Sequence, residues 1–141
     1  MGFEIIEHTA DVGVEAWAAT LEELFVEAAR GLIAVMGRGT GPAELSRRVE
    51  LSAPDVEALL VDWLSELVYA FEVHGVVAAD GDVRIRRPVT QDADWVLEAD
   101  VTGTDANAFE QEGAAVKAVT YHAIEVTEGA SGARARVYLD V

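Results

Sequence analysis

The residues with the clearest chemical potential lie near both ends of the chain. His8-Thr9-Ala10-Asp11 is a short polar stretch between two segments of alternating apolar residues, so it predicts a turn between strands. A histidine and a carboxylate at this spacing on a turn can share a ligand or hydrogen-bond each other. Asp and Thr side chains also stabilise turns through their own backbone. Spacing alone therefore allows a functional or a purely structural role for His8 and Asp11.

The last predicted strand runs to the final residue. Apolar and polar residues alternate over residues 133–141, which is typical of a half-buried strand. The side chain of Asp140 then lies beside the α-carboxylate of Val141, and two adjacent anions are better tolerated with a cation between them. Oxygen-only ligation is typical of Ca²⁺ or Mg²⁺ rather than of zinc. A solvated strand end is the other interpretation of the same pattern.

A third candidate, the segment 116–122, carries the only lysine together with a tyrosine and a histidine. Alternation along a strand turns Lys117, Val119 and Tyr121 to one side and His122 to the other, so Lys117 and His122 do not reach the same point. We expect His122 to be buried and hydrogen-bonded in the core. Lys117 is expected to pair with the acidic residues if their strands are adjacent.

Other patterns add little chemistry. Asp62 and Glu66 are one helical turn apart on a predicted helix and are expected on its solvated side. A second interpretation turns Asp62 toward the loop of Asp11. Residues 37–41 are rich in glycine but lack the lysine and the preceding strand of a P-loop. The absence of cysteine excludes a disulfide scaffold, a thiolate metal site and a cysteine nucleophile.

Two helices and seven strands are predicted to position these residues. Thr20 followed by Glu23 is a capping box that starts an amphipathic helix, and this helix ends at Gly37. A second helix has Pro54 in its first turn and ends at Gly75. Strands are predicted at residues 3–7, 13–18, 47–51, 82–87, 94–102, 116–127 and 133–141.

This order does not alternate strand and helix as a doubly wound sheet does. It predicts an α+β fold, a two-layer sandwich in which two amphipathic helices cover one face of a mixed, mostly antiparallel β-sheet. The length of 141 residues and the absence of a linker predict a single domain over residues 1–141. The pattern does not determine which strands are neighbours.

The charge balance restricts the partners. Asp and Glu total 26 against 10 Lys and Arg, a formal net charge of −16. Such a surface repels phosphate backbones and anionic membranes, so direct, general nucleic-acid binding is not expected. A basic protein or a cation is favoured, although solubility alone is an alternative reason for the acidity. No apolar run is long enough to span a bilayer and no secretory signal is visible, so we expect a cytoplasmic protein.

Four segments taken together resemble the archease family, and the resemblance covers nearly the whole chain. They are the HTADVG loop with Trp17 and the helix start, the LLVDWL to ELVY part of the second helix, the VKAVTYH segment, and the terminal LDV. One of these segments alone would be a weak match. All four in this order and spacing make a specific one.

Archeases are accessory proteins of the RtcB-type RNA ligase, which joins RNA ends during tRNA splicing and repair. The resemblance implies that this protein promotes guanylylation and multiple turnover of the ligase without forming the RNA bond itself. It also implies a divalent-cation site made by Asp11, Asp140 and Val141, for Ca²⁺ with Mg²⁺ or Mn²⁺ as alternatives. Lys117 is implied to be functionally important without binding the metal, and His8 to face the partner.

The sequence departs from the family pattern in two places. Phe109, in the stretch Asn107-Ala108-Phe109-Glu110, stands where a histidine precedes glutamate, and Ser65 stands where asparagine is common. Both departures bear on partner contacts rather than on the cation site. Two other functions stay open. One is a small metal-dependent enzyme with His8 as general base beside a cation at Asp11, and the other is an acidic, metal-free interaction domain.

Overall fold

The computed structural model describes residues 1–7, 11–39, 41–112 and 115–141. Two helices and nine strands are assigned in these ranges, with one short 3₁₀ helix. In chain order they are β1 (Gly2–Glu7), β2 (Asp11–Ala18), α1 (Leu21–Met36), β3 (Gly37–Gly39), β4 (Leu45–Ala53), α2 (Val56–His74), β5 (Val76–Arg86), β6 (Trp95–Asp105), η1 (Ala106–Ala108), β7 (Phe109–Gln111), β8 (Ala118–Gly129) and β9 (Gly132–Asp140).

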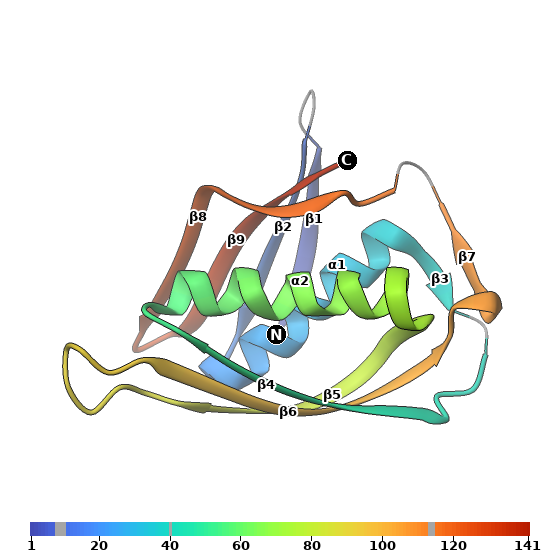
Figure 1. Ribbon diagram of the computed structural model, residues 1–141. Coiled ribbons are helices and arrows are strands. Elements are labelled where there is room, and N and C mark those ends of the chain that lie inside the picture. Colours follow the sequence, from blue (N-terminus) through green and yellow to red (C-terminus); the bar gives the residue numbers. More distant parts are fainter. Residues whose placement is uncertain (8–10, 40, 113–114) are drawn as a thin grey trace.

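The two helices lie between two sheets (Figure 1). One sheet has four strands in the order β1-β2-β9-β8, and the other has three in the order β4-β6-β5, while β3 and β7 form a separate short pair. Every pairing between described strands is antiparallel. Helix α1 contacts β2 on one side and β5 on the other, and α2 contacts β8 and β4.

Local signals position both helices as the sequence predicts, with one shift. The Thr20 hydroxyl accepts a hydrogen bond from the Glu23 backbone N–H at 3.2 Å and so caps α1. Helix α2 is capped by Asp55, which accepts from the Ala58 N–H at 2.7 Å, so Pro54 precedes the cap instead of occupying the first turn. Gly75 ends α2 with a left-handed φ of 67°.

The α+β class, the two amphipathic helices and the mostly antiparallel strands are confirmed, whereas the layering differs. The strands are divided between both sides of the helix pair instead of forming a single sheet on one side. The reason is that α1 is apolar on more than one side. Phe25 and Leu32 are fully buried, and a Cβ at Gly31 would lie only 2.4 Å from Val14 of β2. A helix buried around most of its circumference needs cover on both sides.

A hydrogen bond ties the two helices together inside this core. The indole N–H of Trp63 in α2 donates to the carbonyl oxygen of Phe25 in α1 at 3.0 Å, and both side chains are buried. A buried indole needs such a partner because its N–H leaves water on folding. The helix pair therefore forms a fixed central layer on which both sheets rest.

Several strands extend beyond their predicted ranges, as β2 and β4 do at their starts. In contrast, β8 begins two residues later than predicted, at Ala118, and β9 ends at Asp140, so the prediction that the last strand runs to Val141 is wrong by one residue. β5 begins at Val76, immediately after the glycine that ends α2, and has a register shift between Ala78 and Asp80. The pair β3–β7 was not predicted, because three-residue strands leave no alternation to detect. Backbone contact is close there: a Cβ at Gly37, whose φ is 153°, would collide with the backbone of Glu110.

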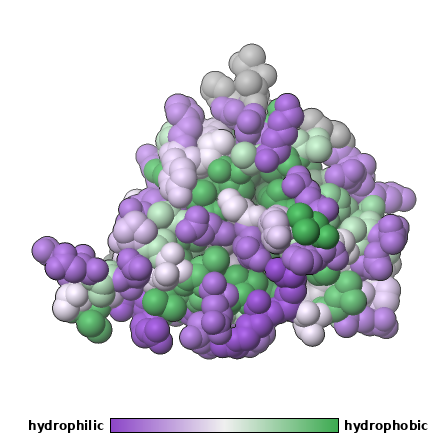
Figure 2. Space-filling view, in the orientation of Figure 1, coloured by the Kyte–Doolittle hydropathy of each residue, from purple (hydrophilic) through white to green (hydrophobic). Residues whose placement is uncertain are grey.

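Hydrophilic residues are spread over the face that Figure 2 shows, with hydrophobic residues visible between them. This distribution agrees with the large excess of acidic side chains in the sequence. Neither helix in the described ranges has the length and apolar character needed to cross a membrane.

Candidate functional site

Asp11 and Asp140 lie directly opposite each other on neighbouring strands. Asp11 is the first residue of β2, Asp140 is the last residue of β9, and the antiparallel register pairs them. Side chains that face each other across two strands point to the same side of the sheet, with Cβ atoms about 5 Å apart. The fold therefore places two carboxylates side by side at one end of the four-stranded sheet.

This pair lies on the side of the sheet that faces away from the helices. β2 buries Val14 and Ala16 and β9 buries Leu139, so the alternate positions of Asp11 and Asp140 are on the outer side. Asp140 is exposed and Asp11 is half-buried. Like charges in opposite positions destabilise a sheet unless something neutralises them. A cation bound here would be accessible to water and to a partner.

The backbone of Lys117 joins the same corner. Its N–H donates to the carbonyl oxygen of Asp140 at 2.8 Å, and the following residue, Ala118, pairs with Asp140 in the β8–β9 register. The side chain of Lys117 is exposed. Three segments that are far apart in the sequence, at the start of β2, the end of β9 and the start of β8, therefore meet at one end of the sheet (Figure 1).

Tyr138 stands beside the two carboxylates, and sequence reasoning missed it. It pairs with Gly13 in the register, two residues along each strand from the aspartates. A Cβ at Gly13 would lie 3.0 Å from the Tyr138 ring and 3.2 Å from the Cβ of Ile6, so a larger residue here would push the ring away by a few tenths of an ångström. The signal was present in the sequence, because a glycine inside a strand often marks the close approach of another group.

β8 loses its regular pairing next to Tyr138. Thr120 pairs with Tyr138 and Glu125 with Arg136, so five steps along β8 correspond to two along β9. The additional residues include Ala123, which has a left-handed φ of 52°. Bulges of this kind bend a strand and redirect its side chains.

The irregularity makes two predictions for this segment wrong. His122 is exposed rather than buried in the core, and its ring centroid lies 6.1 Å from that of Tyr138. Strict alternation also fails, because Tyr121 is exposed although Val119, two residues earlier, is buried; Lys117, also exposed, precedes the start of β8. The physical reason is that the extra residues of β8 leave the sheet plane, so period-two alternation does not continue through them.

The metal ligands predicted from the sequence form a set of oxygens. Within the described residues, no group of three or more His, Cys, Asp or Glu side chains is arranged to hold a metal. The predicted ligand set includes two such side chains, those of Asp11 and Asp140. Its third member is the α-carboxylate of Val141, a residue that is half-buried. Carboxylate oxygens suit a hard cation such as Ca²⁺, which takes about 6–8 oxygen ligands. His8 lies outside the described residues.

The acidic residues of α2 have different environments. Glu66 forms an ion pair with Arg47 of β4, with 2.9 Å between Oε1 and Nη2, so its predicted place on a freely solvated face is wrong. Asp62 is half-buried, and desolvation raises the pKa of its carboxyl above the usual value. The interpretation that turns Asp62 toward the loop of Asp11 stays a prediction, because residues 8–10 are not among the described ones.

Phe109, which departs from the family pattern, is a core residue. It is 8% exposed, and its ring packs edge-on against Phe71 of α2 with 5.7 Å between centroids. An aromatic pair at this distance and angle stabilises the contact between α2 and β7. Ser65, the other departure, is half-buried on α2.

Sequence comparison links the chain to known archeases. The model of the Archease protein family (MTH1598/TM1083) matches residues 3–141. Protein archease of Methanosarcina acetivorans is 36% identical over an alignment of 144 residues that covers 99% of this chain and 95% of that protein. Protein archease of Thermococcus kodakarensis is 39% identical over 127 residues, covering 88% of this chain and 87% of the relative.

Solved structures agree. The solution structure of protein 1598 from Methanobacterium thermoautotrophicum matches with a TM-score of 0.77 and 30% identity over 99% of each chain. The crystal structure of an archease and possible chaperone from Thermotoga maritima matches in fold, with a TM-score of 0.61, 21% identity, and 98% and 96% of the two chains covered. The fold is that of the archease-like α+β proteins. The chain belongs to the archease family.

Proposed function

We propose that this protein activates an RtcB-type RNA ligase in tRNA splicing and RNA repair in the cytoplasm. It promotes guanylylation of the ligase and lets the ligase turn over repeatedly, and it does not catalyse the ligation itself. The observation that carries the proposal is the register that sets Asp11 opposite Asp140 on an accessible end of the sheet. Membership of the archease family supports an accessory role.

Asp11, Asp140 and the carboxylate at Val141 would hold a divalent cation, with Ca²⁺ the first choice and Mg²⁺ or Mn²⁺ as alternatives. The pairing of Asp11 with Asp140 supports this assignment, because two facing carboxylates repel unless a positive charge lies between them. When bound, the cation supplies positive charge for oxygen ligands. Three carboxylates leave coordination positions free for water or for an oxygen of the partner complex.

Lys117 and His8 are the proposed partner-facing residues. The Lys117 backbone is hydrogen-bonded to Asp140 and the residue is exposed, so we assign Lys117 to contact with the partner and not to the metal. A cation and an ammonium at one accessible corner suit contact with phosphate oxygens. The nucleotide of the ligase guanylylation step carries such oxygens.

The overall charge agrees with a role in which the ligase, and not this protein, binds the RNA. A net charge of −16 disfavours direct RNA binding by this chain and favours approach to the basic channel expected in an enzyme that binds RNA and a nucleotide. Association steered in this way is fastest at low ionic strength. The RNA contacts are therefore assigned to the ligase.

A multiple-turnover ligation assay with the cognate ligase tests the proposal. Asp11→Asn and Asp140→Asn keep the shape of each side chain and remove its charge, and both are expected to lose at least about tenfold of the stimulation. Glu4→Gln, on the exposed edge strand of the same sheet, is the matched control and should stimulate normally. Folded aspartate variants that stimulate like wild type would rule out the site.

A further inference from the structure

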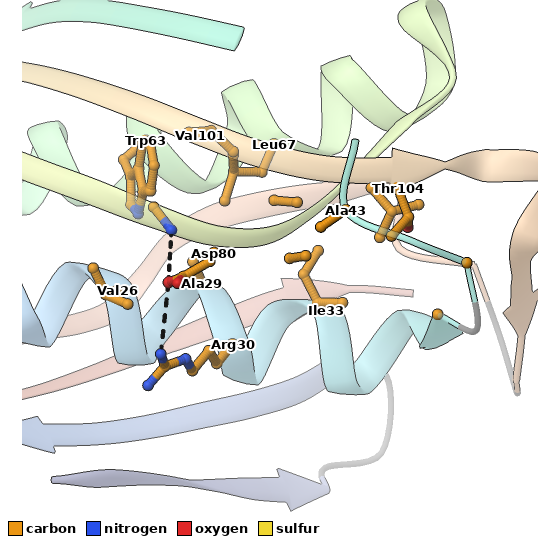
Figure 3. Close-up of a pocket in the computed structure, with 16 residues that line it drawn as sticks. Val26, Ala29, Arg30, Ile33, Ala43, Trp63, Leu67, Asp80, Val101 and Thr104 are labelled. Carbon is orange, nitrogen blue, oxygen red and sulfur yellow. Dashed lines mark hydrogen bonds and ion pairs between the residues drawn. The ribbon is translucent and has the colours of Figure 1, made fainter. Parts of the chain in front are cut away.

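A cavity of about 300 Å³ lies between α1 and β5, at a part of the fold that the proposed function does not use (Figure 3). Its walls are mostly apolar and come from both helices and from the three-stranded sheet. They include Val26, Ile33, Trp63, Leu67, Val77 and Val101. This volume is at the lower end of the range for small-ligand pockets and suits one large apolar group.

Small residues keep the cavity open. Ala29 of α1 and Ala78, Ala79 and Gly81 of β5 all line it. A Cβ at Gly81 would have no neighbouring atom closer than 3.9 Å, so the space beside this strand is free. The register shift of β5 falls between Ala78 and Asp80, within the lining. The cavity therefore results from the residue sizes and the bulge of β5, and apolar walls of this kind favour an apolar occupant.

A charge cluster with a net charge of −1 lies beside the cavity: Arg30 and Asp80 line it, whereas Glu27, which pairs with Arg30, is buried and does not. Arg30 of α1 forms ion pairs with Glu27 of the same helix and, at 3.7 Å, with Asp80 of β5. Figure 3 shows Arg30 and Asp80 pointing toward each other from the two sides. The guanidinium of Arg30 is already paired with Glu27 and Asp80 and is therefore not available to bind the carboxylate of a ligand. An incoming cation would meet Asp80, whose side chain is 67% exposed.

We infer that this cavity binds an apolar side chain of the partner ligase, from a segment that places a Lys or Arg next to it. The inference rests on the proposed function, since it names a second contact with the same partner. Apolar walls select the inserted side chain, and the negative rim selects the neighbouring basic residue. Anchoring of one apolar residue in a fitted pocket is a frequent source of affinity at protein interfaces.

Two variants test the two halves of this inference. Ala29→Phe fills the cavity from its wall, and Asp80→Asn removes the rim charge while keeping the oxygen that accepts from the Gly81 N–H. Val73→Phe, at an exposed position of α2, is the control for the first. Asp82→Asn is the control for the second, because Asp82 is an exposed acid on the same strand and does not line the cavity.

The measurement is the dissociation constant of each variant with purified ligase, together with its stimulation of ligation. Ala29→Phe is expected to bind at least about tenfold more weakly, and Asp80→Asn about threefold more weakly, with the latter difference lost at high salt. Both controls should bind like wild type. Thermal melts establish that each variant is folded, and if Ala29→Phe is not, the comparison of Asp80→Asn with Asp82→Asn decides.

The outcomes separate this inference from the proposed function. Suppose that the wild-type protein stimulates the ligase and that Ala29→Phe and Asp80→Asn bind the ligase as tightly as wild type does. This result overturns the inference and leaves the proposed function intact. Wild-type protein that neither binds nor stimulates the ligase overturns both. Octylammonium chloride serves as a probe for a free ligand. If it raises the melting temperature of wild type but not of Ala29→Phe, while both bind the ligase equally, the cavity is a small-molecule site and the inference fails.

Discussion

Arg87 and Glu128 connect the two large sheets through a two-point ion pair. Arg87 follows β5 directly and Glu128 belongs to β8, and their nitrogen and oxygen atoms are 2.9 Å and 2.6 Å apart in the two contacts. The guanidinium of Arg87 also lies over the ring of Trp95, at 5.4 Å from its centroid. The planar guanidinium matches a carboxylate in this way, whereas an ammonium does not.

Glu128→Gln is expected to destabilise the protein by about 0.5 kcal/mol, because the pair is largely exposed to solvent. The hydrogen bond from Arg87 lowers the pKa of Glu128 below its usual value of 4.5. A lowered pKa in the folded state adds stability above the unfolded value, and this contribution is lost as the pH falls through the folded pKa. Urea melts at pH 7 and at a series of lower pH values should show a difference between variant and wild type that is largest at pH 7 and shrinks as the pH falls below 4.5.

Asp62→Asn is expected to stabilise the protein, in contrast to Glu128→Gln. Burial raises the pKa of Asp62 above its usual value of 3.8, so the charged form is less stable in the folded protein than in the unfolded chain. This cost is present at neutral pH and disappears as the pH falls below the unfolded value. The variant should be more stable than wild type at pH 7, by at most about 0.5 kcal/mol, and equal to it near pH 3. A destabilised variant at pH 7 would contradict this assignment.

Calcium should stabilise the wild-type protein but not the Asp11→Asn or Asp140→Asn variants. Binding to the folded state adds about 2.7 kcal/mol when the free ion is at a hundred times its dissociation constant. Without calcium the two variants should melt at or above the wild-type temperature, because each removes one of two facing carboxylates. Differential scanning calorimetry with and without calcium measures both effects. A wild-type melting temperature that does not respond to Ca²⁺, Mg²⁺ or Mn²⁺ would favour the metal-free interaction domain.

One alanine added after Val141 moves the terminal carboxylate by about 3.3 Å along the strand. The calcium-dependent rise in melting temperature should then shrink, while Val141→Ala, which keeps the carboxylate in place, should retain it. Equal calcium shifts in the two proteins would remove Val141 from the ligand set. The melting temperature without calcium serves as the control for packing of the half-buried valine.

Lys117→Gln separates partner contact from metal binding. The variant is expected to stimulate the ligase at least about tenfold less, with the calcium shift of the melting temperature unchanged. Arg38→Gln, which removes a charge from the exposed β3 strand, is the control and should keep full stimulation. Loss of the calcium shift in Lys117→Gln would instead assign this residue to the metal site.

Local signals predicted the parts of the fold that depend on neighbouring residues. The Thr20 cap and the Gly75 helix end were found from the sequence because each acts within one turn. The division into two sheets was not, since it depends on which sides of α1 are buried. The pairing of Asp11 with Asp140 was also beyond local reasoning, because pairing across most of the chain leaves no trace in the spacing of residues.

The same limit explains the errors in the 116–122 segment. Alternation was extended through a stretch of β8 that has three residues more than its partner strand, so His122 was predicted on the wrong side. An alanine at position 123 gives no warning of a left-handed conformation, which glycine or asparagine would have done. Gly13 indicates from the sequence that another group approaches its strand closely, but only the structure identifies this group as the ring of Tyr138.

The position of β9 has a consequence for how the molecule forms. β9 is the last strand in the chain but lies in the middle of its sheet, between β2 and β8. Two hairpins, β1–β2 and β8–β9, must therefore find each other across most of the sequence, and contacts of such long range slow folding. Until they join, β2 presents an open edge to other chains. Because Asp11 and Asp140 belong to different hairpins, the two carboxylates come together only in this docking step, and a bound cation would stabilise the contact between the two hairpins.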